Sequence, residues 1–205
     1  DGLPTGALRL FTTKLYQFIL EGAVDIRPTH LAIVFDRAEQ TFRKEIYADY
    51  KAQRREAPDD LIPQFPLMRK AVEAFGLKPV EQSGFEADDV IATYATEAGA
   101  AGADTLIISA DKDLMQLVTP TINFYDFESG SRGKPGYRPE RRIGIPEVID
   151  YFGLPPEKVT DVQALVGDPS DNVPGVPGIG LKTAAALISE FGDLETLLLR
   201  VNDIK

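Results

Sequence analysis

Apolar residues near the start of the chain recur at spacings of three and four, which is typical of a helix with one buried face. This pattern runs from Pro4 to Leu20 and is carried by Leu8, Phe11, Leu15, Phe18 and Ile19. Similar patterns from Pro63 to Phe75 and from Glu86 to Ala98 predict two further helices.

Short apolar runs lie between these helical patterns and predict strands at Leu31 to Phe35, Thr105 to Ser109 and Ile122 to Tyr125. Strands this short and apolar are typical of a parallel sheet covered on both faces. The alternation of strands and helices therefore predicts an α/β fold with a mainly parallel sheet flanked by helices. Ligands of such folds gather beyond the carboxyl ends of the strands, where Asp36 and Asp111 fall.

The pattern changes towards the end of the chain. Ser129 to Arg142 is rich in Gly, Pro and Arg without periodicity and is interpreted as a loop or linker. From Ile145 onward the pattern is purely helical. We therefore predict two domains, residues 1–141 and residues 142–205, with the boundary near Arg141.

Composition narrows the possible chemistry. The 205 residues are 43% apolar and 26% charged, which favours a globular chain over a disordered one. The chain has no Cys and one His, which excludes disulfide scaffolds, thiolate nucleophiles and Cys- or His-rich zinc sites. His30 opens an apolar run and is interpreted as a strand-end residue. Since no segment reaches the length of a membrane span, we expect a cytoplasmic protein without a membrane partner.

A basic segment from Phe42 to Asp60 stands out in this acidic chain, whose formal net charge is -10. It could be an ordinary solvated helix face. The alternative is contact with phosphate, because both cationic and aromatic residues are crowded there. The residues concerned are Arg43, Lys44, Lys51, Arg54 and Arg55, with Tyr47 and Tyr50.

Eight carboxylates occur in four separate segments, three of them just beyond apolar elements. If their charges are set aside, the net charge of -10 becomes -2, so the rest of the chain is nearly balanced. They are Asp36, Glu86, Asp88, Asp89, Asp111, Asp113, Asp168 and Asp171.

Any one group of these acids could lie scattered on the surface, and those after Gly84 could serve a helix dipole. Clustered carboxylates repel one another, so bringing them together requires raised pKa values or bound cations. Oxygen ligands without His or Cys favour Mg²⁺ or Mn²⁺. Two such ions about 4 Å apart are the usual device for hydrolysing a phosphodiester. The pattern therefore predicts a two-metal site.

A segment with three glycines, Pro174 to Gly180, leads into the apolar helix predicted from Thr183 to Phe191. Glycines allow tight turns and close approach to a ligand, and free amides at a helix N-terminus suit phosphate. Such a hairpin can hold a nucleic-acid backbone without reading bases, although a plain helix–helix turn is the simpler alternative. The candidate DNA-contacting residues here are Gly175, Gly178, Gly180 and Lys182.

These motifs together resemble the 5′-to-3′ exonuclease and flap endonuclease family, most closely the N-terminal nuclease domain of bacterial DNA polymerase I. The resemblance extends from Pro4 to about Leu199. It rests on Val34-Phe35-Asp36, Phe42-Arg43, Tyr50-Lys51, Glu86-Ala87-Asp88-Asp89, Ala110-Asp111-Lys112-Asp113, Gly167-Asp168-Pro169-Ser170-Asp171-Asn172 and the Gly175 to Gly180 hairpin.

The resemblance implies a fold and an activity. The fold would be a PIN-like nuclease core followed by an all-helical helix-three-turn-helix domain. The activity would be structure-selective 5′-3′ exonuclease or 5′-flap endonuclease cleavage of DNA by a two-metal mechanism in replication and repair. The partners implied are 5′-flap or nicked duplex DNA and a covalently linked polymerase domain.

The resemblance also implies roles for particular residues. Asp168 and Asp171 would lie nearer one metal ion, and the other six carboxylates nearer a second ion. Residues 42–60 would form a helical arch around a 5′ single strand, with Arg43, Lys51 and Arg54 near the scissile phosphate and Tyr50 contacting DNA. Backbone carbonyls of the glycine hairpin would bind a potassium ion.

One departure from the family pattern concerns the N-terminus. Members of the family begin with a strand ending in a Val-Asp-Gly motif whose Asp binds metal, whereas Asp1-Gly2 aligns better with a turn before the first helix. We therefore expect this chain to bind DNA but to cleave it poorly. Two alternatives are a duplex-binding remnant without catalysis and a Mg²⁺-dependent phosphatase that uses an aspartyl nucleophile at Asp111-Lys112-Asp113.

Overall fold

The computed structural model describes residues 2–37, 41–130 and 132–204. Asp1 and Lys205, the outer ends of the predicted domains, lie outside the described residues. The chain divides into two compact units. Unit 1 comprises Asp1–Ile46 and Gln53–Val90, and unit 2 comprises Tyr47–Ala52 and Ile91–Lys205.

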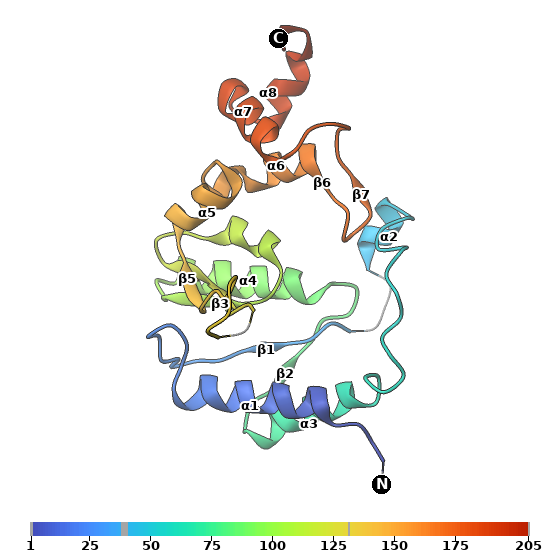
Figure 1. Ribbon diagram of the computed structural model, residues 1–205, viewed down its shortest axis with the longest axis vertical. Helices are drawn as coiled ribbons and strands as arrows, with labels where there is room; N and C mark the ends of the chain where they lie inside the picture. The colour runs from blue at the N-terminus through green and yellow to red at the C-terminus, as the bar shows by residue number, and fades with distance from the viewer. Residues whose placement is uncertain (1, 38–40, 131, 205) are drawn as a thin grey trace. The chain divides into compact units, whose positions relative to one another are not determined.

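Unit 1 contains a pair of helices packed beside a short parallel strand pair (Figure 1). The helices are α1 (Gly6–Leu20) and α3 (Gln64–Ala74), and both were predicted. They are joined by a hydrogen bond of 3.0 Å from the Leu8 backbone N–H to Oε1 of the buried Gln64. The strands are β1 (Ile33–Val34) and β2 (Pro79–Val80), so the predicted strand at 31–35 is shorter than expected and β2 is an addition.

Helix α4 (Ala87–Ala100) follows β2 and carries acidic residues in its first turn. It confirms the helix predicted from Glu86. The predicted helical arch is different: among the described residues of 42–60, only α2 (Phe42–Ile46) is helical. The rest of that segment consists of turns and irregular backbone, and its residues 47–52 belong to unit 2.

Unit 2 contains a sheet with strand order β3-β4-β5. Strands β3 (Thr105–Ile108) and β4 (Ile122–Asp126) were predicted and pair in parallel. Strand β5 (Arg141–Ile143) pairs antiparallel to β4 and lies partly in the range interpreted as a loop, so that interpretation was wrong there. A 3₁₀ helix, η1 (Lys112–Leu117), follows β3.

The C-terminal part of unit 2 is mostly helical. Its helices are α5 (Ile145–Phe152), η2 (Pro156–Lys158), α6 (Val159–Val166), α7 (Leu181–Phe191), α8 (Leu194–Leu199) and η3 (Val201–Asp203). The expectation of a purely helical pattern was wrong at one place, between α6 and α7. There β6 (Gly167–Asp168) and β7 (Val173–Pro174) form an antiparallel hairpin, visible beside α6 in Figure 1.

The strands and the C-terminal helices of unit 2 share one hydrophobic core. Phe124 on β4 and Ile143 on β5 belong to the same buried cluster as Val148, Val162 and Ile188 on the helices. Each of these five side chains is at most 1% exposed. The boundary near Arg141 therefore stays a prediction, because residues on both sides of it pack together. Within the described part of the chain, no helix is both long and apolar enough to cross a membrane.

The hairpin between α6 and α7 depends on two glycines whose backbones touch. Gly167 has a φ of +76°, and a Cβ placed there would lie 2.2 Å from the backbone nitrogen of Gly175. A Cβ on Gly175 would lie 2.1 Å from the carbonyl oxygen of Val166. Neither distance is compatible with a side chain unless the backbone moves. Both glycines are therefore required for the structure of the hairpin.

We expect Gly167→Ala and Gly175→Ala each to lower the free energy of unfolding by about 2 kcal/mol or more, because the added methyl group collides with backbone atoms. The matched control is Gly180→Ala, which should change it by less than about 0.5 kcal/mol. Gly180 has a negative φ of -100° and no atom within 4 Å of the added Cβ. Urea unfolding of the three variants measures this difference, and equal values would contradict the backbone contact.

Candidate functional site

The eight predicted carboxylates fall into two groups of four, one in each unit. Unit 1 holds Asp36, Glu86, Asp88 and Asp89, whereas unit 2 holds Asp111, Asp113, Asp168 and Asp171. Each group combines the end of a strand with a second segment far away in the sequence. The convergence of all eight on one pair of metal ions stays a prediction.

Asp36 in unit 1 lies two residues beyond β1 and is tied to the start of α4. Its Oδ1 accepts a hydrogen bond of 2.7 Å from the backbone N–H of Ala87. Its carbonyl oxygen accepts a second one of 2.9 Å from Nη2 of Arg69. The structure thus brings Asp36 to the helix turn that carries Asp88 and Asp89, as expected for the carboxyl end of a strand.

Asp89 is engaged by Arg43. The two Nη atoms of Arg43 donate to the two carboxylate oxygens of Asp89, both at 2.7 Å. Asp89 Oδ2 also accepts from the backbone N–H of Glu86 at 3.0 Å. Because bidentate, charge-assisted bonds are among the strongest polar contacts in proteins, Asp89 holds Arg43 and the first turn of α4 in place. The sequence predicted Asp89 as a metal ligand and Arg43 as a phosphate contact, but it did not predict that they pair.

In unit 2, Asp111 follows β3 and caps η1, because its Oδ1 accepts from the backbone N–H of Asp113 at 2.9 Å. Asp113 in turn accepts a hydrogen bond from Nε2 of Gln163 on α6. Sequence reasoning missed Gln163. The available signal was weak, since it is one polar residue within the otherwise mostly apolar end of α6.

Electrostatic interactions connect the acids of unit 2. Burial raises the pKa of the Asp113 carboxyl, and the negative charges of Asp111, Asp168 and Asp171 raise it further. The hydrogen bond from Gln163 acts in the opposite direction. The end of β3 and the β6–β7 turn therefore bring their carboxylates close enough to repel one another.

The β6–β7 turn also binds the basic segment. Oδ2 of Asp171 accepts a hydrogen bond of 2.9 Å from the hydroxyl of Tyr50 and lies 3.6 Å from Nζ of Lys51. Tyr50 is buried, and Nζ of Lys51 lies 4.8 Å from the centroid of its ring. Asp168 accepts from the backbone N–H of Ser170 at 2.7 Å. Two predicted DNA-contacting residues are thus held by a predicted metal ligand.

The remaining predicted residues lie at accessible positions. Arg54 and Lys182 are exposed, as are Gly178 and Gly180 of the hairpin. Gly180 precedes the first turn of α7 without providing a side-chain cap. The amides of that turn can therefore face an anion, and Lys182 adds a positive charge beside them.

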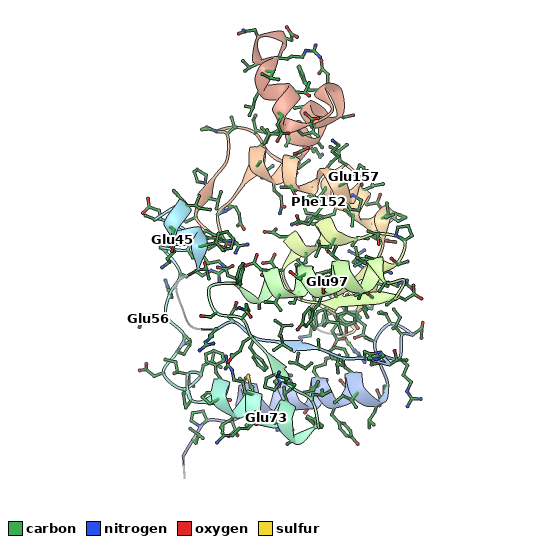
Figure 2. The ribbon with its side chains drawn as sticks, turned by 180° about the vertical axis from the view of Figure 1, so that it is seen from behind. Glu45, Glu56, Glu73, Glu97, Phe152 and Glu157 are labelled. Carbon is green, nitrogen blue, oxygen red and sulfur yellow. The ribbon has the colours of Figure 1, made fainter. Side chains whose placement is uncertain are left out.

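The donor set suits a hard divalent cation, since it consists of carboxylate oxygens whose mutual repulsion a cation would relieve. The carboxylates are not gathered into a ready chelate, however. Among the residues that the structure describes, no three acidic or His side chains form a group that could hold a metal ion. Several other acids are solvated, and the five glutamates labelled in Figure 2 (Glu45, Glu56, Glu73, Glu97 and Glu157) are all exposed.

We expect Asp113→Asn to raise the melting temperature of the metal-free protein at neutral pH by about 1–3 °C. The carboxylate is disfavoured in the folded state, whereas an Asn oxygen can still accept from Gln163. A raised pKa means that this penalty is full above the folded-state pKa and disappears as the pH falls below the ordinary Asp value of 3.8.

Thermal unfolding in EDTA across this pH range measures the effect of Asp113→Asn. Asp193→Asn is the control and should lower the melting temperature. Hydrogen bonds from Thr196 lower the pKa of Asp193, so they favour its charged form. A lower melting temperature for Asp113→Asn at neutral pH would contradict the repulsion among these acids.

Comparison with known proteins identifies the family. Residues 1–151 match the model for "5′-3′ exonuclease, N-terminal resolvase-like domain". Residues 154–205 match the model for "5′-3′ exonuclease, C-terminal SAM fold". DNA polymerase I of Rhizobium leguminosarum is 51% identical over 208 residues, which cover 100% of this chain and 20% of that protein. The chain thus spans about a fifth of the length of this curated relative.

Solved structures agree with these matches. The bacteriophage T5 5′-exonuclease with bound zinc ions has a TM-score of 0.75 and 25% identity, covering 93% of this chain and 70% of that one. The T5 flap endonuclease in complex with DNA and metal ions has a TM-score of 0.74 and 24% identity, with the same coverage. Because family models match almost all of its length, this chain belongs to the 5′-3′ exonuclease family.

Proposed function

We propose that this chain is a metal-dependent 5′ nuclease that hydrolyses phosphodiester bonds of 5′-flap or nicked duplex DNA in replication and repair. The observation that carries the proposal is the arrangement in unit 2, where Asp111 caps the turn that holds Asp113, and where Asp171 bonds to Tyr50 and Lys51 of the basic segment. Support also comes from relatives that are named as 5′-exonuclease and flap endonuclease and contain metal ions or DNA. A cytoplasmic location would follow from DNA as the substrate.

The metal would be Mg²⁺ or Mn²⁺, because the predicted ligands are all carboxylate oxygens. In the proposed division, Asp168 and Asp171 would serve one ion and Asp111 and Asp113 the other, all four within unit 2. Asp36, Glu86 and Asp88 of unit 1 stay predicted ligands. Bound divalent ions would activate water and stabilise the leaving oxygen. Asp89 has a different part in this proposal, since its carboxylate is occupied by Arg43 and by the Glu86 amide. It would orient Arg43 towards the substrate.

The basic residues would act on the reacting phosphate. Negative charge grows on the phosphate oxygens during hydrolysis, so a cation held in place stabilises the transition state more than the ground state. Asp171 and the ring of Tyr50 restrict Lys51 to one position, which favours this role. Arg54 is exposed and would add to the attraction for the single strand.

The hairpin before α7 would hold the duplex. Phosphate oxygens can accept hydrogen bonds from the amides of the first turn of α7, and Lys182 adds attraction that weakens with salt. Backbone carbonyls between Gly175 and Gly180 would provide the ligands for a potassium ion. Because these contacts reach phosphates and not bases, the binding would depend on DNA shape and not on sequence.

A duplex-binding protein without catalysis is the second candidate. It is favoured by one observation, that within the described residues no three acidic or His side chains form a metal-binding group. A phosphatase is the third and weakest reading, because it leaves the hairpin before α7 without a role.

We expect the purified chain to cut a 5′-flap duplex in Mg²⁺ and to lose this activity in EDTA. Asp111→Asn should remove most of the cleavage while the protein stays folded, because a ligand is lost and repulsion within the cluster decreases. Gel analysis of labelled flap DNA gives the rate, and thermal unfolding verifies folding. Full activity of Asp111→Asn would exclude Asp111 as an important ligand. Duplex binding without cleavage in any variant would favour the second candidate.

We expect Lys51 and the α7 hairpin to affect different steps. Lys51→Ala should lower turnover by about 100-fold with little change in duplex affinity, because its charge acts on the transition state. Gly180→Asp should weaken duplex affinity roughly tenfold by placing a negative charge against the phosphates. Lys44→Ala serves as the control, since Lys44 is an exposed cation of the same basic segment. Single-turnover rates and binding titrations measure both steps, and equal losses in both would contradict this division.

A further inference from the structure

The turn between β6 and β7 is bonded to the backbone of the basic segment, and one residue in these contacts has no assigned role. Nδ2 of Asn172 donates a hydrogen bond of 2.8 Å to the carbonyl oxygen of Asp49, which lies 123 positions earlier in the chain. On the other side of the turn, the carbonyl oxygen of Asp171 accepts from the backbone N–H of Lys51 at 2.9 Å. The two bonds enclose Tyr50, whose hydroxyl reaches the carboxylate of Asp171.

The backbone at both ends of this contact is left-handed. Asn172 has a φ of 59° and Lys51 a φ of 56°. Asn visits this region readily, because its short amide can bond locally, whereas Lys rarely does. The conformation of Lys51 is therefore imposed by the contacts it makes with the turn and not by its own preference.

The side chain of Lys51 follows from its backbone. It is only 18% exposed and lies between the ring of Tyr50 and the carboxylate of Asp171. A segment free to leave the turn would lose this position, since the direction of Cβ depends on φ. Fixing the carbonyl of Asp49 and the amide of Lys51 thus fixes where the ammonium group points.

We propose that Asn172 is a positioning residue, which holds residues 49–51 against the β6–β7 turn and so places Lys51 for its role at the phosphate. The catalytic part of this inference rests on the proposed function. The structural part, that the Asn172 amide keeps Lys51 in place, does not. Asn172 is also separable from Asp171, because its amide carries no charge and its contact is with a backbone carbonyl.

Amide hydrogen exchange, followed by NMR, tests the structural part without any nuclease activity. Asn172→Gly removes the amide side chain but permits the positive φ, so the exchange of the Lys51 amide should become about 2- to 10-fold faster. Ser170→Ala is the matched control in the same turn, since Ser170 is exposed and contributes only its backbone N–H to the bond with Asp168. Slow hydrogen exchange of the β4 amides shows that each variant is folded.

An unchanged exchange rate at Lys51 in Asn172→Gly would overturn the inference. Asn172→Asp gives a second test, because it keeps the size of the side chain and tolerates positive φ but cannot donate from its carboxylate to Asp49. It should accelerate the exchange at Lys51 at least as much as Asn172→Gly does. Slower exchange than in the wild-type protein would also overturn it.

Kinetics on flap DNA test the catalytic part. Asn172→Gly should lower kcat about 2- to 10-fold with unchanged KM in the native background, and it should have no further effect in a Lys51→Ala background. An equal effect in both backgrounds would show that Asn172 acts on stability and not through Lys51, and would overturn the inference. If no variant cleaves DNA at all, the proposed function fails, whereas faster exchange at Lys51 would still support the structural contact.

Discussion

Repulsion between carboxylates is the constraint on which the rest of this structure depends. Burial makes the charge of Asp113 costly, and the negative charges of three other acids add to that cost. A chain can tolerate such a cluster only if each carboxylate is offset by donors that do not carry further negative charge. The donors here come from the backbone, from an amide and from cations. Backbone N–H groups bond to Asp36, Asp111 and Asp168, and Gln163 bonds to Asp113.

The cations that pair with carboxylates in each unit come from one short part of the sequence. Arg43 pairs with Asp89 inside unit 1, and Lys51 pairs with Asp171 inside unit 2. Each of these pairs is partly exposed, so each contributes about 1 kcal/mol or less to stability in the absence of ligand. In the proposed function, their larger effect is on phosphate binding. A phosphate approaching uncompensated carboxylates would be repelled, whereas carboxylates already paired with Arg or Lys present it with bound cations.

Much of the fold could be predicted from the sequence, because α1, α3 and α4 are long enough to show a helical period and β3 and β4 are continuous apolar runs. Strands β2 and β6 have two residues each and cannot show one. Strand β5 was missed because its Arg141 and Arg142 lie at the end of a segment rich in Gly, Pro and Arg. The helical arch over residues 42–60 was an expectation from the family resemblance, and a cluster of charged and aromatic residues carries no helical period that could have set its length. The carboxylates of the candidate site were predicted from their residue type and from their position after apolar runs.

Their partners could not be found from the sequence. Arg43 and Asp89 lie 46 positions apart, and Tyr50 and Asp171 lie 121 positions apart. Only the folded backbone specifies which acid meets which donor over such separations. The need for glycine at Gly167 and Gly175 could not be found from the sequence either, because it arises from a contact between two backbone segments. The glycine motif predicted that the backbone comes close to a ligand. At Gly175 the backbone instead comes close to another segment of the same chain.

The bonds of the β6–β7 turn differ in how they respond to charge. The contacts of Tyr50 and Lys51 end on the carboxylate of Asp171, so they weaken whenever that carboxylate is shared with another positively charged group. The bonds from Asn172 to Asp49 and from Lys51 to the Asp171 carbonyl involve no ionised group, and they are worth about 0.5–1.5 kcal/mol each. That is comparable to the cost of about 1–2 kcal/mol for a left-handed Lys. The neutral bonds can therefore keep the basic segment in register while the charged ones exchange partners.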